Sequence, residues 1–232
     1  MSSVVREAVE TIDLDELTVR ELNGRLHAFG DGGRVRIVHP GGRHSIAAGL
    51  DAAYELEIDG HVGYYCAGMN QRATVRIHGN AGVGVAENMM SGLVEVDGSA
   101  SQSAGASSHG GLLKIGGDAS ARCGISLKGA DIVVAGSVGH LSAFMAQTGC
   151  LVVCGDAGEA LGDSIYEARV YVRGTVASLG ADCVEKELGD EHVQQLSQLL
   201  ERAGVDADAA EFRRYGSARR LYNFEIDNAG AY

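Results

Sequence analysis

The sequence is poor in proline and in aromatic residues. Of its 232 residues only one is proline, none is tryptophan, and the three aromatic types together make up 5%. So few large rings argue against the aromatic core of an ordinary globular domain. Glycine is plentiful instead, with 34 residues. Glycine rather than proline is therefore expected to make the corners of this chain.

Positive charge and long apolar runs are also scarce. Lys and Arg number 19 against 31 Asp and Glu, a formal net charge of −12, which argues against nucleic acid or an anionic membrane as the main partner. No apolar run has the length of a membrane span, and the first residues do not resemble a secretory leader. The five cysteines form no C-x-x-C pair. We therefore expect a reduced, cytoplasmic protein.

Glycine recurs at a strict interval of 19 residues through the middle of the chain, at Gly60, Gly79, Gly98, Gly117, Gly136, Gly155 and Gly174. Ile or Val stands two residues before each of these glycines, and another aliphatic residue stands four before it. Such alternation is typical of a half-buried strand. We expect the seven glycines to be structural corners, because glycine can take the positive φ that a sharp corner needs. Seven residues after each of them only Ala or Gly occurs, which indicates a narrow point of the coil.

A residue type that repeats at a fixed interval indicates successive turns of one coil. We therefore predict an all-β fold, a right-handed parallel β-helix formed as a single-stranded solenoid of 19-residue coils. About seven turns stack at about 4.8 Å, with the aliphatic columns inside. The β-helix is expected over residues 46–183, a small α/β N-terminal cap over residues 1–45, and helices with an extended tail over residues 184–232.

The expected N-terminal cap carries helix and strand signals. Thr18 and Glu21 have the spacing of a capping box, in which each side chain satisfies a backbone donor near the other. The expected helix runs from Thr18 to Phe29 and is followed by a strand at residues 35–38. This segment would close one end of the solenoid, whose strand edge is otherwise unpaired. It would also serve as a docking surface for a partner.

The pattern after Cys183 becomes helical. Asp190 is expected to cap a helix that ends at Gly204, and a second short helix is expected over residues 208–215. The end of the chain combines basic and aromatic residues: Arg213, Arg214, Tyr215, Arg219, Arg220, Tyr222 and Phe224. Such a tail favours contact with the acidic flank of the solenoid or with another subunit over binding of nucleic acid.

The corners of the coils vary in sequence, and several carry Met, Tyr and amide side chains that suit an adaptable protein interface. The alternative is that Met and Phe simply pack under the coil. The candidate subunit interface comprises Tyr64, Tyr65, Met69, Asn70, Glu87, Asn88, Met89, Met90, Phe144, Met145, Tyr166, Arg219 and Arg220.

No constellation of catalytic or metal-ligating residues stands out. Four histidines of the coils fall on different columns of the repeat, at His61, His78, His109 and His140. Stacking of the coils therefore does not bring them together as metal ligands. Cys150 and Cys154 are four residues apart, which fits buried thiols, with ligation of a cluster as the alternative. We expect no catalytic residue, no cofactor-binding residue and no metal site on this chain.

Residues 41–49, Gly-Gly-Arg-His-Ser-Ile-Ala-Ala-Gly, followed by the glycine-marked coils, resemble the C-terminal GXGXG β-helix domain of glutamate synthase large subunits. That domain family also includes one of the subunits of tungsten or molybdenum formylmethanofuran dehydrogenase. Residues 63–70, 86–92 and 162–168 resemble more closely the free-standing glutamate synthase-like subunit of N-methylglutamate synthase. The sequence departs from the family pattern at Ser101 and Ser120, which stand where other coils keep glycine.

The resemblance implies a non-catalytic scaffold subunit of an enzyme complex. Its partners would be a class II amidotransferase-like subunit and an FMN-binding glutamate synthase-like subunit, with FMN and an iron–sulfur cluster in the partner and no cofactor on this chain. The complex would be a hetero-oligomer that forms N-methylglutamate and ammonia from glutamate and methylamine. The alternatives are a formylmethanofuran dehydrogenase, a related complex of glutamine and glutamate metabolism, or a self-contained solenoid enzyme. A hexapeptide acyltransferase is disfavoured because its six-residue period does not divide 19.

Overall fold

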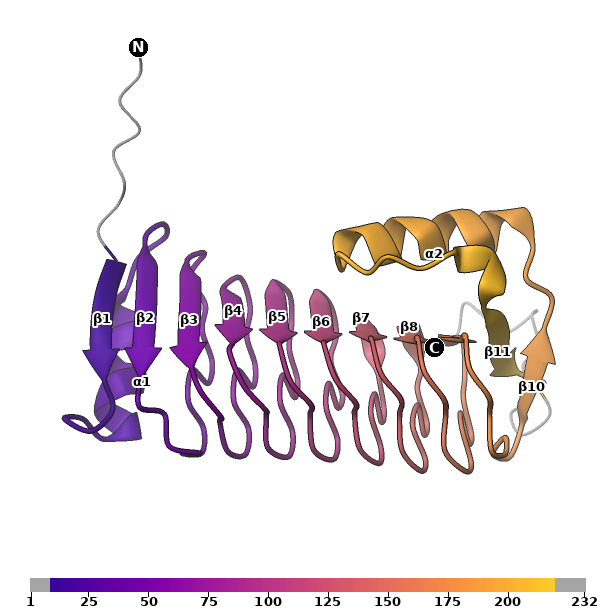
Figure 1. Cartoon of the computed structure of the whole chain (residues 1–232), viewed down its shortest axis with the longest axis horizontal. Helices are drawn as coiled ribbons and strands as arrows, with labels where there is room; N and C mark the ends of the chain where they lie inside the picture. Colours follow the sequence, from indigo (N-terminus) through magenta and orange to yellow (C-terminus); the bar gives the residue numbers. More distant parts are fainter. Residues whose placement is uncertain (1–8, 220–232) are drawn as a thin grey trace, which may run out of the picture.

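The computed structural model describes residues 9–219 and shows a long parallel β-solenoid (Figure 1). Within these residues, eleven strands form one sheet in the order β1-β2-β3-β4-β5-β6-β7-β8-β9-β11-β10. The predicted all-β solenoid is therefore confirmed. In this part of the chain, neither of the two α-helices is long and apolar enough to cross a membrane.

Each coil contributes one strand, and neighbouring strands pair in parallel in a register of 19 residues. Leu56 pairs with Val75 and Val75 with Val94, and all three side chains are fully buried in the core. A second line of parallel bridges begins with Val62 and Ala81 and continues through the coils. The strands of the coils are β3 (Glu55–Asp59), β4 (Thr74–Ile77), β5 (Leu93–Val96), β6 (Leu112–Ile115), β7 (Lys128–Val134), β8 (Thr148–Val153) and β9 (Arg169–Val172).

The repeated glycines do not act as expected. Of the seven, only Gly60 has a positive φ, so the prediction of a positive-φ corner is wrong for the other six. They are needed because the coils approach closely: a Cβ on Gly155 would lie 2.7 Å from the carbonyl carbon of Gly136. Positive φ recurs instead at five, seven and nine positions after the repeated glycines, as at Tyr65 with φ of 62°, Ala67 with φ of 53° and Met69 with φ of 57°.

A polar side chain follows each repeated glycine and completes the hydrogen bonding between coils. His61 Nδ1 accepts a hydrogen bond from the backbone N–H of Asn80 at 2.9 Å, and Asn80 Oδ1 accepts one from that of Ser99 at 2.8 Å. The same contact recurs at this position in the later coils. This ladder is not evident from the sequence, because its side chains share no residue type. It makes His61 a structural residue.

The N-terminal segment consists of β1 (Val9–Asp13), α1 (Val19–Ala28) and β2 (Arg34–Val38). The capping box is confirmed, because the backbone N–H of Glu21 donates to Thr18 Oγ1 at 3.3 Å and that of Thr18 donates to Glu21 Oε2 at 2.9 Å. Leu22 and Leu26 are buried against the coils. Strand β1, which pairs in parallel with β2, was not predicted.

The C-terminal segment differs from the prediction in two respects. Helix α2 (Asp190–Arg202) begins after Gly189 without a side-chain cap, so Asp190 lies in the first turn and does not cap the helix. The expected second helix is only the 3₁₀ turn η1 (Ala209–Glu211), after which β11 (Arg213–Ser217) is a strand. It pairs antiparallel with both β9 and β10 (Cys183–Lys186), because the open edge of β9 offers backbone groups that need partners.

Helix α2 lies over the outer side of the C-terminal half of the sheet (Figure 1). On this face the column three residues before the repeated glycines changes from charged to apolar, ending in Val133, Val152 and Tyr171. These residues pack against Leu196 and Leu199 of α2 in a second hydrophobic core. The helix therefore covers the part of the sheet whose outward side chains are apolar.

Candidate functional site

The candidate interface contains four large apolar side chains that remain exposed. Tyr64 is 57% exposed, Met69 44%, Met90 47% and Met145 39%. Exposed Met and Tyr side chains are adaptable contact residues when they lie close enough to form one surface.

Two of these methionines lie on neighbouring coils. The backbone N–H of Met90 donates to the carbonyl of Asn70, the residue after Met69, at 2.8 Å. Met145 occupies the same position of the repeat as Met69, four coils further along the chain. At about 4.8 Å for each coil, the two residues are about 19 Å apart. The coils are joined by the continuous strand ladder. The stacked coils therefore hold two apolar contact points, Met69 with Met90 and Met145, at a fixed separation along one rod.

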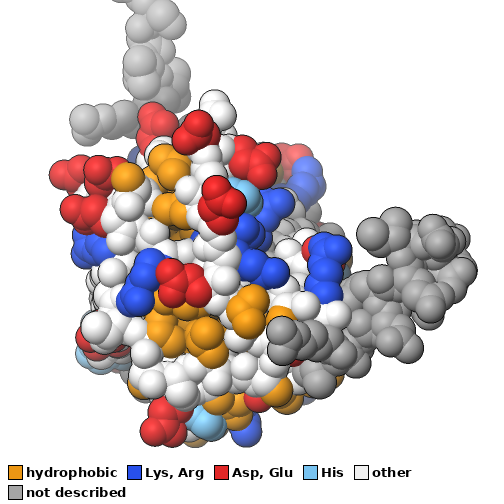
Figure 2. Space-filling view, turned by 90° about the vertical axis from the view of Figure 1, so that its right-hand side faces the viewer, with side chains coloured by type: hydrophobic (Ala, Val, Ile, Leu, Met, Phe, Trp, Pro, Cys, Tyr) orange, Lys and Arg blue, Asp and Glu red, His pale blue; other side chains and the backbone are white. Residues whose placement is uncertain are grey.

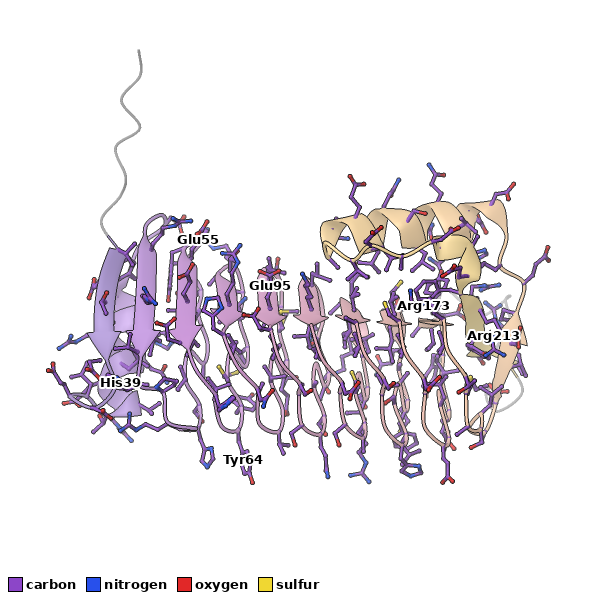
Figure 3. The ribbon with its side chains drawn as sticks, in the orientation of Figure 1. His39, Glu55, Tyr64, Glu95, Arg173 and Arg213 are labelled. Atoms are coloured by element: carbon purple, nitrogen blue, oxygen red, sulfur yellow. The ribbon has the colours of Figure 1, made fainter. Side chains whose placement is uncertain are left out.

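The exposed ring of Tyr64 is fixed by its neighbour His44. The two rings stack with centroids 4.4 Å apart and an angle of 17° between their planes. His44 Nδ1 also accepts a hydrogen bond from the backbone N–H of Tyr64 at 2.9 Å. Figure 3 shows Tyr64 pointing away from the coils. This exposed ring is thus held in one orientation before any partner binds.

Two members of the predicted interface are fully buried. Asn70 is 0% exposed and donates its amide to the carbonyls of Ala73 at 2.9 Å and Ser91 at 3.2 Å. Met89 is also 0% exposed and packs in the core. Both hold coils together and cannot contact a partner, so the prediction is wrong for these two residues.

The other members have intermediate exposure or lie near the C-terminal end. Those of intermediate exposure are Tyr65, Glu87, Asn88, Phe144 and Tyr166. Arg219 pairs with Glu167, with Nη2 and Oε2 3.0 Å apart. Arg220 lies outside the described residues, as do Tyr222 and Phe224.

The uncovered half of the outer sheet face carries charge pairs across the strands. Arg34 of β2 lies 2.7 Å from Glu55 of β3, and Arg76 of β4 lies 2.8 Å from Glu95 of β5. Glu55 and Glu95 are labelled in Figure 3. Cross-strand pairs of opposite charge stabilise a solvated sheet face modestly, so this half is a hydrated surface.

Asp13, Asp15 and His39 form a cluster at the N-terminal end that sequence analysis missed, because it depends on the unpredicted strand β1. His39 Nδ1 lies 2.9 Å from Asp13 Oδ1 and 3.7 Å from Asp15 Oδ2. The hydrogen bond with Asp13 raises the pKa of His39. Arg43 lies 3.4 Å from Asp15. With His39 and Arg43 beside two carboxylates, the cluster is an exposed polar group that includes the ion pair of Arg43 and Asp15.

Of the histidines on the coils, His78 is paired with Asp97, with Nδ1 and Oδ2 2.8 Å apart. The cysteines are mostly buried. Burial raises the pKa of Cys66, Cys123 and Cys150 to about 12, so these thiols stay protonated at neutral pH. Cys150 and Cys154 both lie in the second core, under α2.

The sequence matches no protein-family model. It is 59% identical over 225 residues to "Protein GlxC" of Rhizobium meliloti (strain 1021), a match that covers 95% of this chain and 99% of that protein.

Proposed function

The chain belongs to the family of protein GlxC, and we propose that it is a non-catalytic scaffold subunit of a glutamate synthase-like complex. The observation that carries this proposal is the pair of exposed apolar contact points, Met69 with Met90 and Met145, held apart on one rod. Exposed apolar side chains at fixed positions suit a subunit that positions two partners.

The rod is suited to this task because its parts cannot move independently. The six steps from β3 to β9 span about 29 Å at about 4.8 Å each, and each step is hydrogen-bonded along both the strands and the second line of bridges. Shortening or bending such a stack breaks many backbone hydrogen bonds at once. Two partners bound along it would keep a constant separation.

The proposed partners are a class II amidotransferase-like subunit and an FMN-binding glutamate synthase-like subunit that also carries an iron–sulfur cluster. The proposed reaction converts glutamate and methylamine into N-methylglutamate and ammonia, in the cytoplasm. The resemblance of residues 63–70, 86–92 and 162–168 to the free-standing subunit of N-methylglutamate synthase supports this choice. In this complex the chain holds the partners and takes no part in the chemistry.

Gentle purification of the tagged full chain from its native cells tests the proposal. We expect a yellow complex whose absorbance shows flavin, whose mass spectra show the two partner subunits, and which forms N-methylglutamate from glutamate and methylamine. Molybdenum or tungsten in place of flavin would identify the formylmethanofuran dehydrogenase alternative. A colourless chain that purifies alone would contradict the scaffold proposal.

A further inference from the structure

The C-terminal end of the solenoid contains a hollow of about 290 Å³ between β9, β10, β11 and the first turn of α2. Figure 2 views this end of the molecule and shows Lys and Arg side chains gathered there. Its charged and titratable lining residues are Arg169, Lys186, Arg214, Arg219, His192, Glu167 and Tyr166. Four cationic groups against one carboxylate stand out on a chain whose formal net charge is −12.

Two of these cations face each other directly across a pair of strands. Lys186 of β10 is the antiparallel partner of Arg214 of β11, which in turn is the partner of Tyr171 of β9. Like charges directly opposite each other destabilise a sheet. An anion bound between them would convert this repulsion into attraction.

A glycine of β11 leaves room beside these cations. Gly216 of β11 lines the hollow, and a Cβ atom on it would lie 3.8 Å from Lys186 Cγ. Its φ is not positive, so the backbone does not require glycine here. Because Tyr215 pairs with Val170, Arg169 flanks Gly216 on the neighbouring strand. The glycine leaves a notch in the sheet between cationic side chains.

The two guanidinium groups nearest the notch are oriented by neutral acceptors. Arg169 Nη1 donates to Gln195 Oε1 at 2.7 Å, and Arg214 Nε donates to the backbone carbonyl of Glu187 at 2.7 Å. Such contacts hold the guanidinium in place without cancelling its charge. Each retains N–H groups for a further acceptor.

The positive charge of the residues that line the hollow is only partly neutralised by carboxylates. Arg219 is paired with Glu167. Across residues 9–219 no ion pair joins a carboxylate to Lys186 or Arg214. Beside the hollow, Tyr171 Oη and His192 Nδ1 are buried and have no hydrogen-bond partner in the described part of the chain. Buried polar atoms are normally paired.

We propose that this notch is a binding site for a small oxyanion, the phosphate or carboxylate group of a metabolite. Arg169 and Arg214 supply forked donors suited to such groups, and Lys186 supplies a third, mobile cation. A hollow of about 290 Å³ accommodates a small ligand. The site is independent of the proposed scaffold function, which assigns no ligand to this chain.

Isothermal titration calorimetry of the full chain with inorganic phosphate and, separately, with L-glutamate tests the proposal. At low ionic strength we expect one saturable site for at least one of these probes, weakened by added salt because charges attract the ligand. Tighter binding of phosphate identifies a phosphorylated ligand, and tighter binding of L-glutamate identifies a carboxylate. No saturable binding of either probe at millimolar concentration would overturn the proposal.

Two variants locate the site, with circular dichroism to verify folding. Lys186→Gln is expected to weaken binding about tenfold or more, since a charge-assisted hydrogen bond is lost. Lys128→Gln, the same change at an exposed position of β7, is expected to leave affinity unchanged. An equal loss in both variants would indicate general charge attraction and overturn the assignment.

Gly216→Ala provides a test that removes no charge. The added methyl group narrows the notch, so the affinity for the bound probe is expected to fall. The protein is expected to unfold at a higher temperature, because alanine restricts the unfolded chain and fits here without a clash. Unchanged affinity in this variant would place the oxyanion elsewhere.

Discussion

Gly79 lies directly over the backbone of Gly60, so closely that a Cβ atom on Gly79 would stand 2.7 Å from the Gly60 carbonyl carbon and 2.8 Å from its oxygen. The atoms in the way belong to the backbone, which cannot rotate aside as a side chain can. The interval of 19 residues between these glycines therefore reflects contact between coils.

Gly79→Ala is expected to destabilise the protein by about 1–3 kcal/mol, because the coils must separate to admit the methyl group. Urea denaturation followed by circular dichroism measures this change. Gly24→Ala in α1 is the matched control, since an added Cβ there meets nothing within 4 Å. It is expected to stabilise the protein by up to about 1 kcal/mol through helix propensity. A similar effect of both variants would contradict the role of close approach.

The pair of His39 and Asp13 is expected to make stability depend on pH. The pKa of His39 is raised above 6.5 by its hydrogen bond with Asp13 and by the charge of that carboxylate. The pKa of Asp13 is lowered below 3.8, first by the backbone N–H of Asp15 and then by His39. The contribution of this pair to the free energy of unfolding is therefore fully present between pH 3.8 and pH 6.5, the ordinary pKa values of the two groups. It is lost as pH rises through the folded pKa of His39 or falls through that of Asp13.

Comparing His39→Gln with the unaltered chain across pH tests this expectation. The difference in unfolding free energy should be largest between pH 3.8 and 6.5 and should shrink on either side. NMR titration of the His39 ring provides the pKa directly. A pKa for His39 at or below 6.5 would contradict the pairing.

Because α2 packs on the sheet through a separate hydrophobic core, we expect that this helix can be loosened without unfolding the coils. Leu196 is 1% exposed in this core, so Leu196→Ala is expected to cost about 2–5 kcal/mol of local stability. Cys150 and Cys154 lie beneath the helix and should react faster with a thiol reagent in this variant. Gln194→Ala, at an exposed position of the same helix, should leave the rate unchanged. Equal rates in both variants would show that α2 does not shield these thiols.

The proposed partner contacts predict a selective effect of charge at the exposed methionines. Met69→Asp is expected to weaken capture of the partner subunits by about tenfold or more, because a carboxylate would be desolvated at the contact. The fold should be unaffected, since the side chain is 44% exposed. Val9→Asp, at a residue 49% exposed in β1, is the control and should retain the partners. Undiminished capture of the partner subunits by Met69→Asp would show that Met69 is not part of the interface.

Sequence alone determined the solenoid and its register. The columns that contain Leu56 and Val75 repeat at the interval at which the strands pair, and a repeat reports contacts between coils as directly as a local pattern reports a helix. The capping box of Thr18 and Glu21 was equally readable, because both partners lie within one turn. The switch to Val133, Val152 and Tyr171 on the outer column was also present in the sequence, as a signal for a covering helix.

Tertiary structure alone decided the features that join distant segments. Residues Arg213–Ser217 form a strand because β9 and β10 both offer them backbone partners, and no local propensity reports such an edge. The cation pair of Lys186 and Arg214 and the cluster of Asp13 with His39 depend on the same kind of pairing. A repeat predicts contacts between equivalent positions, whereas these sites combine positions that are not equivalent. Their geometry therefore follows only from the folded ends of the rod.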